Sequence, residues 1–179
     1  MYKLKLTSLQ QDILEFLFTY PEKSFTGRAI SLSMKMTQPG ISKALPHLER
    51  SGMIIMRKDR ATKRLSIALN RDNRLVAGLK RAYNLRSIYD SGLANFLEDT
   101  FPGTTIILFG SYSRGDDTSA SDIDIAIIGG SEKNIDLMRF ENEMHRKIST
   151  SFFVSAAKIH RELRQNILGG IVLAGGMEL

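Results

Sequence analysis

The stretch from Thr104 to Gly130 most constrains the fold, because two β-branched apolar runs enclose a polar loop there. "TTIILFG" and "DIDIAIIGG" have the length and composition of buried strands. The loop between them, "SYSRGDDTSAS", is short and polar. Side chains two apart on a strand point to the same face, so Asp122 and Asp124 form a pair of neighbouring carboxylates while Ile123 turns into the core.

Two carboxylates held this close repel each other unless a cation lies between them. Hard oxygen ligands of this kind suit Mg²⁺ (or Mn²⁺), which binds through one or two carboxylates together with substrate phosphates. Gly110 allows the backbone to approach a phosphate, and Ser111 adds a hydroxyl and an N–H group near a helix start. The stretch therefore predicts a site for a metal-bound nucleoside triphosphate, with Asp116 and Asp117 as solvated turn residues.

The segment "GSYSRGDDTSASDIDIAII" closely resembles the Gly-Ser…Arg-Gly…Ser-Asp-Ile-Asp signature of the DNA polymerase β nucleotidyltransferase superfamily, in particular its minimal branch. The resemblance implies attack of an acceptor on the α-phosphate of a metal-bound nucleoside triphosphate, with release of pyrophosphate. It implies that Gly110 and Ser111 grip phosphates, with Arg114 close by. It also implies that Asp122 and Asp124 are the catalytic, metal-binding pair.

The chain departs from this family at a third carboxylate, which the family carries on a later, neighbouring strand as metal ligand and base. The corresponding run here, "RKISTSFFVS", contains no acidic residue. Upstream, Glu141 and Glu143 fall in a predicted helix, where a surface charge is the expected role. We expect one of Ser149 and Ser151 to face the metal site and the other to face outward, and we expect transfer to be slow or absent.

The two halves of the chain differ in charge. Residues 1–90 hold 17 Lys and Arg against 7 Asp and Glu, whereas residues 91–179 hold 8 against 12. A basic half of this kind favours a polyanionic partner, although a solvated basic surface without a partner is the alternative.

The basic half has the element order of a winged helix-turn-helix. Three helical patterns precede two strand-like runs, "MIIMRK" and "KRLSIALN", which are joined by a basic hairpin tip. The segment "SKALPHLERSGMIIMRKDRATKRLSIAL" resembles the recognition helix and wing of regulators of the MarR and ArsR groups. Pro46 lies deep in the third helix, where it should kink or divide that helix.

The resemblance implies binding to double-stranded DNA, since a helix start can bring side chains to base edges and wing cations can neutralise phosphates. A winged helix used as a protein-binding or dimerising module remains the alternative. The expected DNA-binding residues are Gln38, Ser42 and Lys43 on the third helix and Arg60, Lys63 and Arg64 on the wing.

We predict an α+β chain with a winged helix over residues 1–70, a linking helix over 71–100, and a polymerase β-type nucleotidyltransferase domain with a small mixed sheet over 101–179. The linking helix could supply a homodimer surface or simply pack on its neighbours. The absence of cysteine and of long apolar runs predicts a cytoplasmic protein without a membrane span. Two functions compete: an enzyme that transfers a nucleotidyl group to an unknown acceptor, and a DNA-binding regulator whose degenerate domain acts as a nucleotide sensor or scaffold. We favour the first slightly.

Overall fold

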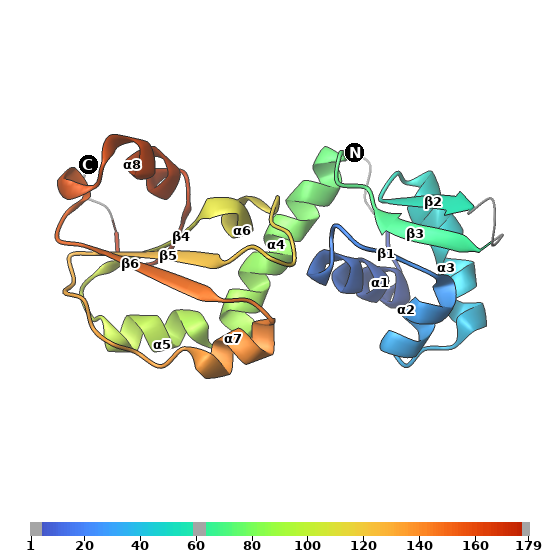
Figure 1. The fold of residues 1–179 in the computed structure, drawn as a ribbon, viewed down its shortest axis with the longest axis horizontal. Helices are drawn as coiled ribbons and strands as arrows, with labels where there is room; N and C mark the ends of the chain where they lie inside the picture. Colours follow the sequence, from blue (N-terminus) through green and yellow to red (C-terminus); the bar gives the residue numbers. More distant parts are fainter. Residues whose placement is uncertain (1–4, 59–63, 177–179) are drawn as a thin grey trace. The chain divides into compact units, whose positions relative to one another are not determined.

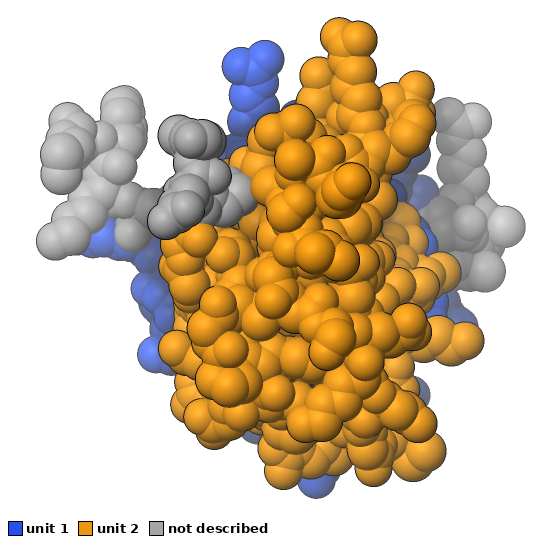
Figure 2. Space-filling view, turned by 90° about the vertical axis from the view of Figure 1, so that its left-hand side faces the viewer, with its two compact units in different colours: residues 1–80 blue, residues 81–179 orange. Residues whose placement is uncertain are grey.

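The computed structural model describes residues 5–58 and 64–176. The chain divides into two compact units, residues 1–80 and residues 81–179 (Figures 1 and 2). Among the described residues, no helix has both the length and the apolar character that crossing a bilayer requires.

Unit 1 begins with three helices, and each follows a threonine whose hydroxyl accepts a backbone N–H group from the first turn. Thr7 caps α1 (Ser8–Thr19) and also forms a capping box with Gln10. Two further threonines, at 26 and 37, cap α2 (Gly27–Ser33) and α3 (Gln38–Arg50). The residues that these helices bury together include Ile13, Leu17, Ile30, Ile41, Leu45 and Leu48.

The three helices pack with a small antiparallel sheet whose strand order is β1-β3-β2. The predicted hairpin strands are β2 (Ile54–Lys58) and β3 (Leu65–Leu69), and a two-residue strand that the sequence did not indicate, β1 (Ser24–Phe25), pairs with β3. This is the winged-helix order of three helices and a hairpin. Of the two expected effects of Pro46, a kink or a division, the division is wrong, because α3 continues through Pro46. Pro46 lies on the exposed side, and the buried Ala44, Leu45 and Leu48 hold the helix against the core.

The linking segment forms α4 (Arg74–Asp90) and α5 (Leu93–Thr100), separated at Gly92, whose φ is +74°. Leu75 and Tyr89 are large apolar residues of α4, but they are 46% and 48% exposed. The buried stripe of α4 is instead Val76, Lys80, Asn84 and Ile88, one residue every four.

Unit 2 contains a mixed four-stranded sheet with the order β6-β5-β4-β7. The strands are β4 (Thr105–Phe109), β5 (Ile123–Ile128), β6 (Ile148–Phe153) and β7 (Ile171–Ala174). β5 and β6 run parallel, whereas β4 is antiparallel to both β5 and β7. The short α6 (Gly110–Arg114) connects β4 to the loop before β5.

Helices cover both faces of this sheet (Figure 1). Residues of α5 and α7 (Met138–Met144) join Ile106, Leu108, Ile123 and Ile125 in the larger core cluster. The other face carries Ile107, Ala126 and Ile128, which pack with Ile159 and with Ile167 of α8 (Arg161–Leu168). A short 3₁₀ turn (Ala156–Lys158) precedes α8, and Ile159 lies between them. The chain is thus a winged helix followed by an α+β unit with a small mixed sheet.

Candidate functional site

The segment from Gly110 to Asp124 lies at the end of the sheet where β4 ends and where β5 and β6 begin. Phe109 pairs with Asp124 across the β4–β5 ladder, and the next residue, Gly110, starts α6 with a φ of +73°. A Cβ atom at Gly110 would collide with the Asp124 carboxylate, whose Cγ would lie 3.1 Å away. Only glycine therefore satisfies both the backbone conformation and the close approach of this carboxylate.

Asp122 is exposed and Asp124 is half-buried at the start of β5. Burial raises the pKa of Asp124 above its ordinary value, the negative charge of Asp122 raises it further, and the positive charge of Arg114 lowers it. The structure thus brings Asp122 and Arg114 close enough to Asp124 to act on the charge of that carboxyl group. The net upward shift indicates that the negative charge at Asp124 is under-compensated, which is the electrostatic condition that favours a bound cation.

Arg114 and Ser111 border the same turn. The Arg114 Nε atom lies 3.2 Å from Asp116 Oδ2, in an exposed pair. Exposed pairs of this kind contribute about 0–1 kcal/mol, so Asp116 does little to fix the arginine. Ser111 is half-buried in the first turn of α6.

Asp117 is not a solvated turn residue as predicted: it is 1% exposed. Its Oδ1 atom accepts a hydrogen bond of 2.7 Å from Asn84 Nδ2, and its Oδ2 atom lies 3.9 Å from the guanidinium of the buried Arg146. The same Asn84 amide donates to the Tyr112 carbonyl oxygen at 2.9 Å. Tyr112 is itself buried, and burial together with the charge of Asp117 raises the pKa of its hydroxyl. This buried network ties α4, the α6 turn and the start of β6 together.

The sequence reasoning missed Asn84, Asp117 and Arg146. A usable signal existed in α4, where Lys80 and Asn84 interrupt an otherwise apolar stripe with period four. Polar residues on a buried stripe need partners, so they indicate a polar network in the fold.

Strand β6 carries no carboxylate beside the pair. The register aligns Ser149 with Asp124 and Ser151 with Ala126 in the parallel β5–β6 ladder. The expectation that one serine faces the site and the other faces outward is wrong, since residues two apart share a face and both lie on the Asp124 side. Among the described residues, no group of three or more Asp, Glu, His or Cys is placed to hold a metal ion.

The two upstream acids differ in role. Glu141 is half-buried and its Oε1 atom accepts the Ile148 N–H at 2.9 Å, so it anchors the start of β6 instead of serving as a surface charge. Glu143 is exposed, as expected of a surface charge.

A cavity of about 420 Å³ opens beside Asp122, and we call it the Asp122 cavity. Its walls come from the loop before β5 and from the segment that leads from α7 into β6. The lining residues are Ser119, Ala120, Ser121, Asp122, Glu141, Asn142, His145, Arg146 and Lys147.

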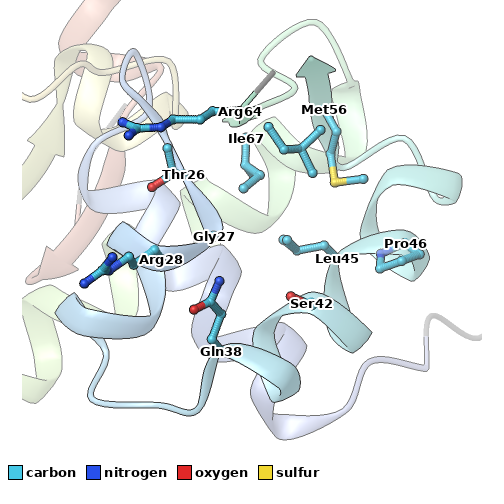
Figure 3. Close-up of a pocket in the computed structure, with 11 residues that line it drawn as sticks. Thr26, Gly27, Arg28, Gln38, Ser42, Leu45, Pro46, Met56, Arg64 and Ile67 are labelled. Carbon is cyan, nitrogen blue, oxygen red and sulfur yellow. The ribbon is translucent and has the colours of Figure 1, made fainter. Parts of the chain in front are cut away.

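In unit 1, three of the predicted DNA-binding residues line one cavity of about 530 Å³, which we call the α3–hairpin cavity (Figure 3). These are Gln38 and Ser42 of α3 and Arg64 beside β3. Lys43 is exposed on α3 and does not line the cavity, whereas Arg60 and Lys63 lie outside the described residues.

Arg28 also lines this cavity and was not predicted (Figure 3). It lies in the first turn of α2, after the Thr26 cap. The floor of the cavity is apolar and includes Leu45, Met56 and Ile67.

Comparison with known proteins finds a family match within unit 2 and similar solved structures for about half of the chain. Residues 91–170 match the family described as "Nucleotidyltransferase domain". No curated protein matches the chain. Asn84 precedes the matched segment, so the buried network joins a residue outside the family match to the α6 turn within it.

Solved structures of bacterial regulators align with part of the chain. MepR of Staphylococcus aureus is 25% identical over 53% of this chain and 66% of its own, with a TM-score of 0.41. The adhesin competence repressor AdcR of Streptococcus pyogenes is 20% identical over 54% of this chain and 69% of its own, with a TM-score of 0.42. ZitR of Lactococcus lactis is 25% identical over 52% of this chain and 64% of its own, with a TM-score of 0.41. The chain therefore spans only about two thirds of the length of these regulators.

The winged-helix assignment rests on the order of helices and strands in unit 1, since those TM-scores are low. The family match covers most of unit 2 and includes the Gly110 turn and both aspartates. The chain thus matches the nucleotidyltransferase domain family over residues 91–170, and this segment is preceded by a unit with the element order of a winged helix.

Proposed function

We propose that unit 2 binds a nucleoside triphosphate with Mg²⁺ (or Mn²⁺) and transfers its nucleotidyl group to an acceptor hydroxyl, and that unit 1 binds duplex DNA. The observation that supports nucleotide binding most strongly is the close approach of the Asp124 carboxylate to Gly110, with Asp122 two residues earlier, inside the segment that matches the nucleotidyltransferase family.

The residues present fit one divalent cation. Asp122 and Asp124 offer hard oxygen ligands, and the pKa of Asp124 is raised first by burial and then by the charge of Asp122, which a bound cation would offset. When bound, such an ion would neutralise charge on the triphosphate and polarise its α-phosphate. These two carboxylates would hold it, because the described residues supply no third acid.

The chain's own groups would do the rest. The backbone at Gly110 and the Ser111 hydroxyl would contact phosphate oxygens, with the exposed Arg114 as a further positive charge beside them. Asn84 would keep the turn in place through the Tyr112 carbonyl.

A second candidate function is a nucleotide sensor without catalysis. The alignment of Ser149 with Asp124 favours it, because a hydroxyl brings no negative charge to hold a second ion and cannot serve as the base that a carboxylate would supply. Nucleotide binding is common to both candidates, whereas transfer belongs only to the first.

Titration calorimetry of the full chain with a nucleoside triphosphate, with and without Mg²⁺, tests nucleotide binding. The Asp122→Asn/Asp124→Asn double variant should lose the metal-dependent part of the affinity while keeping its circular dichroism spectrum. An unchanged affinity in that variant would exclude the site. Incubation with α-labelled triphosphates and a panel of acceptors then separates the enzyme from the sensor.

DNA binding by unit 1 is supported by the basic composition of residues 1–90 and by the placement of Gln38, Ser42 and Arg64 around one cavity. Fluorescence anisotropy with a labelled duplex at several salt concentrations tests it, since phosphate contacts make affinity fall steeply with salt. Absence of duplex affinity at low salt would leave the winged helix as a protein-binding module.

A further inference from the structure

Ser149 projects beside the Asp124 carboxylate from the neighbouring strand. β5 lies between β4 and β6 in the sheet (Figure 1), and Ser149 of β6 is the register partner of Asp124. Register partners on adjacent strands lie about 4.8 Å apart and project from the same face of the sheet. Ser149 is also exposed. A solvent-accessible hydroxyl thus stands next to a carboxylate of the proposed metal site.

The Gly110 turn and Ser149 flank Asp124 from opposite sides. On the β4 side, Phe109 is the partner of Asp124, and a Cβ atom at the following Gly110 would lie 3.1 Å from the Asp124 Cγ atom. Ser149 stands on the β6 side. In phosphoryl transfer the attacking and the leaving oxygen lie roughly in line at the phosphorus. A triphosphate whose β- and γ-phosphates lie at the Gly110 turn would therefore be attacked at its α-phosphorus from the side of Ser149.

The other hydroxyls nearby are less accessible. Of the described serines and threonines on β4, β5 and β6, Ser149 alone is exposed. Thr150 is turned to the opposite face, and Ser151 is the partner of Ala126, which is fully buried in the apolar cluster on the α8 side of the sheet. Ser113 of the Gly110 turn is 3% exposed and donates its hydroxyl to a backbone carbonyl of the same turn at 2.8 Å. Among these groups Ser149 is the best placed to reach a bound triphosphate.

We propose that the Ser149 hydroxyl is itself the acceptor of the nucleotidyl group, so that the chain modifies itself, an inference that rests on the proposed nucleotide binding and transfer. The Ser149 oxygen forms a bond to the α-phosphorus, and the bond from that phosphorus to the bridging oxygen breaks. Pyrophosphate leaves with the electron pair, and the hydroxyl proton passes to water. The product is a nucleoside monophosphate joined to Ser149 through a phosphodiester.

The absence of a carboxylate on β6 slows this step without preventing it. A serine hydroxyl is a weak nucleophile when no base activates it. A hydroxyl already held within reach of the phosphorus, however, avoids the entropy cost of bringing in an acceptor from solution. Modification is therefore slow and takes place once in each chain. The attached nucleotide then fills the space beside Asp124, so a modified chain should no longer bind a triphosphate with Mg²⁺.

The position of Ser149 can be tested without any turnover. The chain contains no cysteine, so Ser149→Cys and Ser151→Cys each introduce a single thiol that iodoacetamide alkylates. The probe is the α,β-methylene analogue of a nucleoside triphosphate with Mg²⁺, which cannot transfer its nucleotidyl group. At a free concentration of about ten times its Kd it leaves about one chain in eleven empty, so alkylation of Ser149→Cys should slow by about tenfold. Ser151→Cys is the matched control and should keep its rate.

The transfer itself is followed by intact-mass spectrometry and peptide mapping of the full chain. Wild type incubated with α-labelled triphosphates and Mg²⁺ should gain one nucleotidyl group on Ser149. Ser149→Ala should lose the label while keeping the analogue affinity, and Ser151→Ala should keep the label. Asp122→Asn/Asp124→Asn, which retains Ser149, should stay unlabelled when mixed with wild type, because transfer takes place within one chain. Label on an added acceptor is measured separately, since variants of Ser149 remove only the acceptor within the chain.

The outcomes separate this inference from the proposed function. If the analogue fails to bind, or binds equally well to Asp122→Asn/Asp124→Asn, the nucleotide site itself is wrong. If the analogue binds but leaves alkylation of Ser149→Cys unchanged, Ser149 does not border the bound phosphates and the inference fails. Wild type that binds the analogue but gains no label, Ser149→Ala that keeps the label, or label mapped to another residue would each overturn the acceptor assignment. Label passed to the double aspartate variant would overturn transfer within one chain.

Discussion

Replacing Asn84 by leucine should destabilise unit 2 specifically. The side-chain amide of Asn84 is 2% exposed and donates both of its hydrogens, one to the Asp117 carboxylate at 2.7 Å and one to the Tyr112 carbonyl at 2.9 Å. Leucine has no donor, so both acceptors remain buried with a partner lost. A hydrogen bond to a charged group contributes about 1.5–3 kcal/mol and one to a neutral carbonyl about 0.5–1.5 kcal/mol, so we expect a loss of about 2–4 kcal/mol in the free energy of unfolding.

Hydrogen exchange followed by mass spectrometry measures this loss of stability separately in each unit of the intact chain. Where opening precedes exchange and closing is fast, the exchange rate of the most protected amides follows the free energy of opening. A loss of about 2–4 kcal/mol should therefore accelerate the slowest amides of β4 and β5 by about 30-fold to 700-fold. Amides of α1 and α3 in unit 1 should keep their rates and serve as an internal reference.

Asn95→Leu is the matched control, because it makes the same substitution at an exposed position of α5. It should change exchange in β4 and β5 by less than about threefold, as surface substitutions stay within about 0.5 kcal/mol. If Asn84→Leu behaves like this control, the Asn84 hydrogen bonds do not stabilise the turn. If amide exchange in α1 and α3 accelerates as much as in β4 and β5, the effect is not confined to unit 2.

Three further predictions concern the nucleotide and metal site of unit 2, and a fourth concerns DNA binding by unit 1. Gly110→Ala should abolish metal-dependent nucleotide binding in calorimetry, because its methyl group displaces the Asp124 carboxylate, whereas Gly103→Ala, with a similar φ of +74° but no atom within 4 Å of the added carbon, should retain it. Magnesium affinity should be full above the raised pKa of Asp124 and fall as pH drops through it, at a higher pH than for an ordinary aspartate; a fall only near the ordinary value would contradict the electrostatics. Ser149→Asp should tighten divalent binding and raise any transfer activity, and no change in either would show that the missing acid is not the limiting feature. Arg64→Ala should weaken duplex binding across all sequences and reduce the salt slope by up to about 0.9, whereas a selective effect on one sequence would place this side chain on a base.

The core of the candidate site could be predicted from the sequence because its determinants are local. The alternation of Asp122, Ile123 and Asp124 places both carboxylates on one face through strand geometry alone. The β-branched run before Gly110 and the glycine itself mark the end of one strand and the turn after it. The structure confirms the end of the first strand, the glycine after it and the small mixed sheet, whereas β5 begins at Ile123 and Asp122 stands just before it.

The features that the sequence did not reveal depend on partners that are distant along the chain. Asp117 looks like a solvated loop residue until Asn84, 33 positions earlier, is placed beside it. That Ser149 and Ser151 share a face follows from strand geometry, but which of them stands level with Asp124 depends on the register between β5 and β6, which hydrophobic pattern alone does not fix. The continuity of α3 through Pro46 is likewise a tertiary effect, since buried neighbours outweigh the lost backbone hydrogen bond.

The absence of a carboxylate on β6 should affect nucleotidyl transfer more than nucleotide binding. The experiment that distinguishes the two candidate functions must therefore measure transfer. A nucleoside triphosphate would be held by the Gly110 turn, by one cation on Asp122 and Asp124, and by the exposed Arg114, none of which needs a carboxylate on β6. The carboxylate that would activate the attacking hydroxyl, however, is missing from β6, where Ser149 stands level with Asp124. Loss of charge there should weaken the stabilisation of the entering oxygen while leaving the phosphates in place. Nucleotide affinity is therefore expected of both an enzyme and a sensor, and only the transfer rate, compared between wild type and Ser149→Asp, discriminates between them.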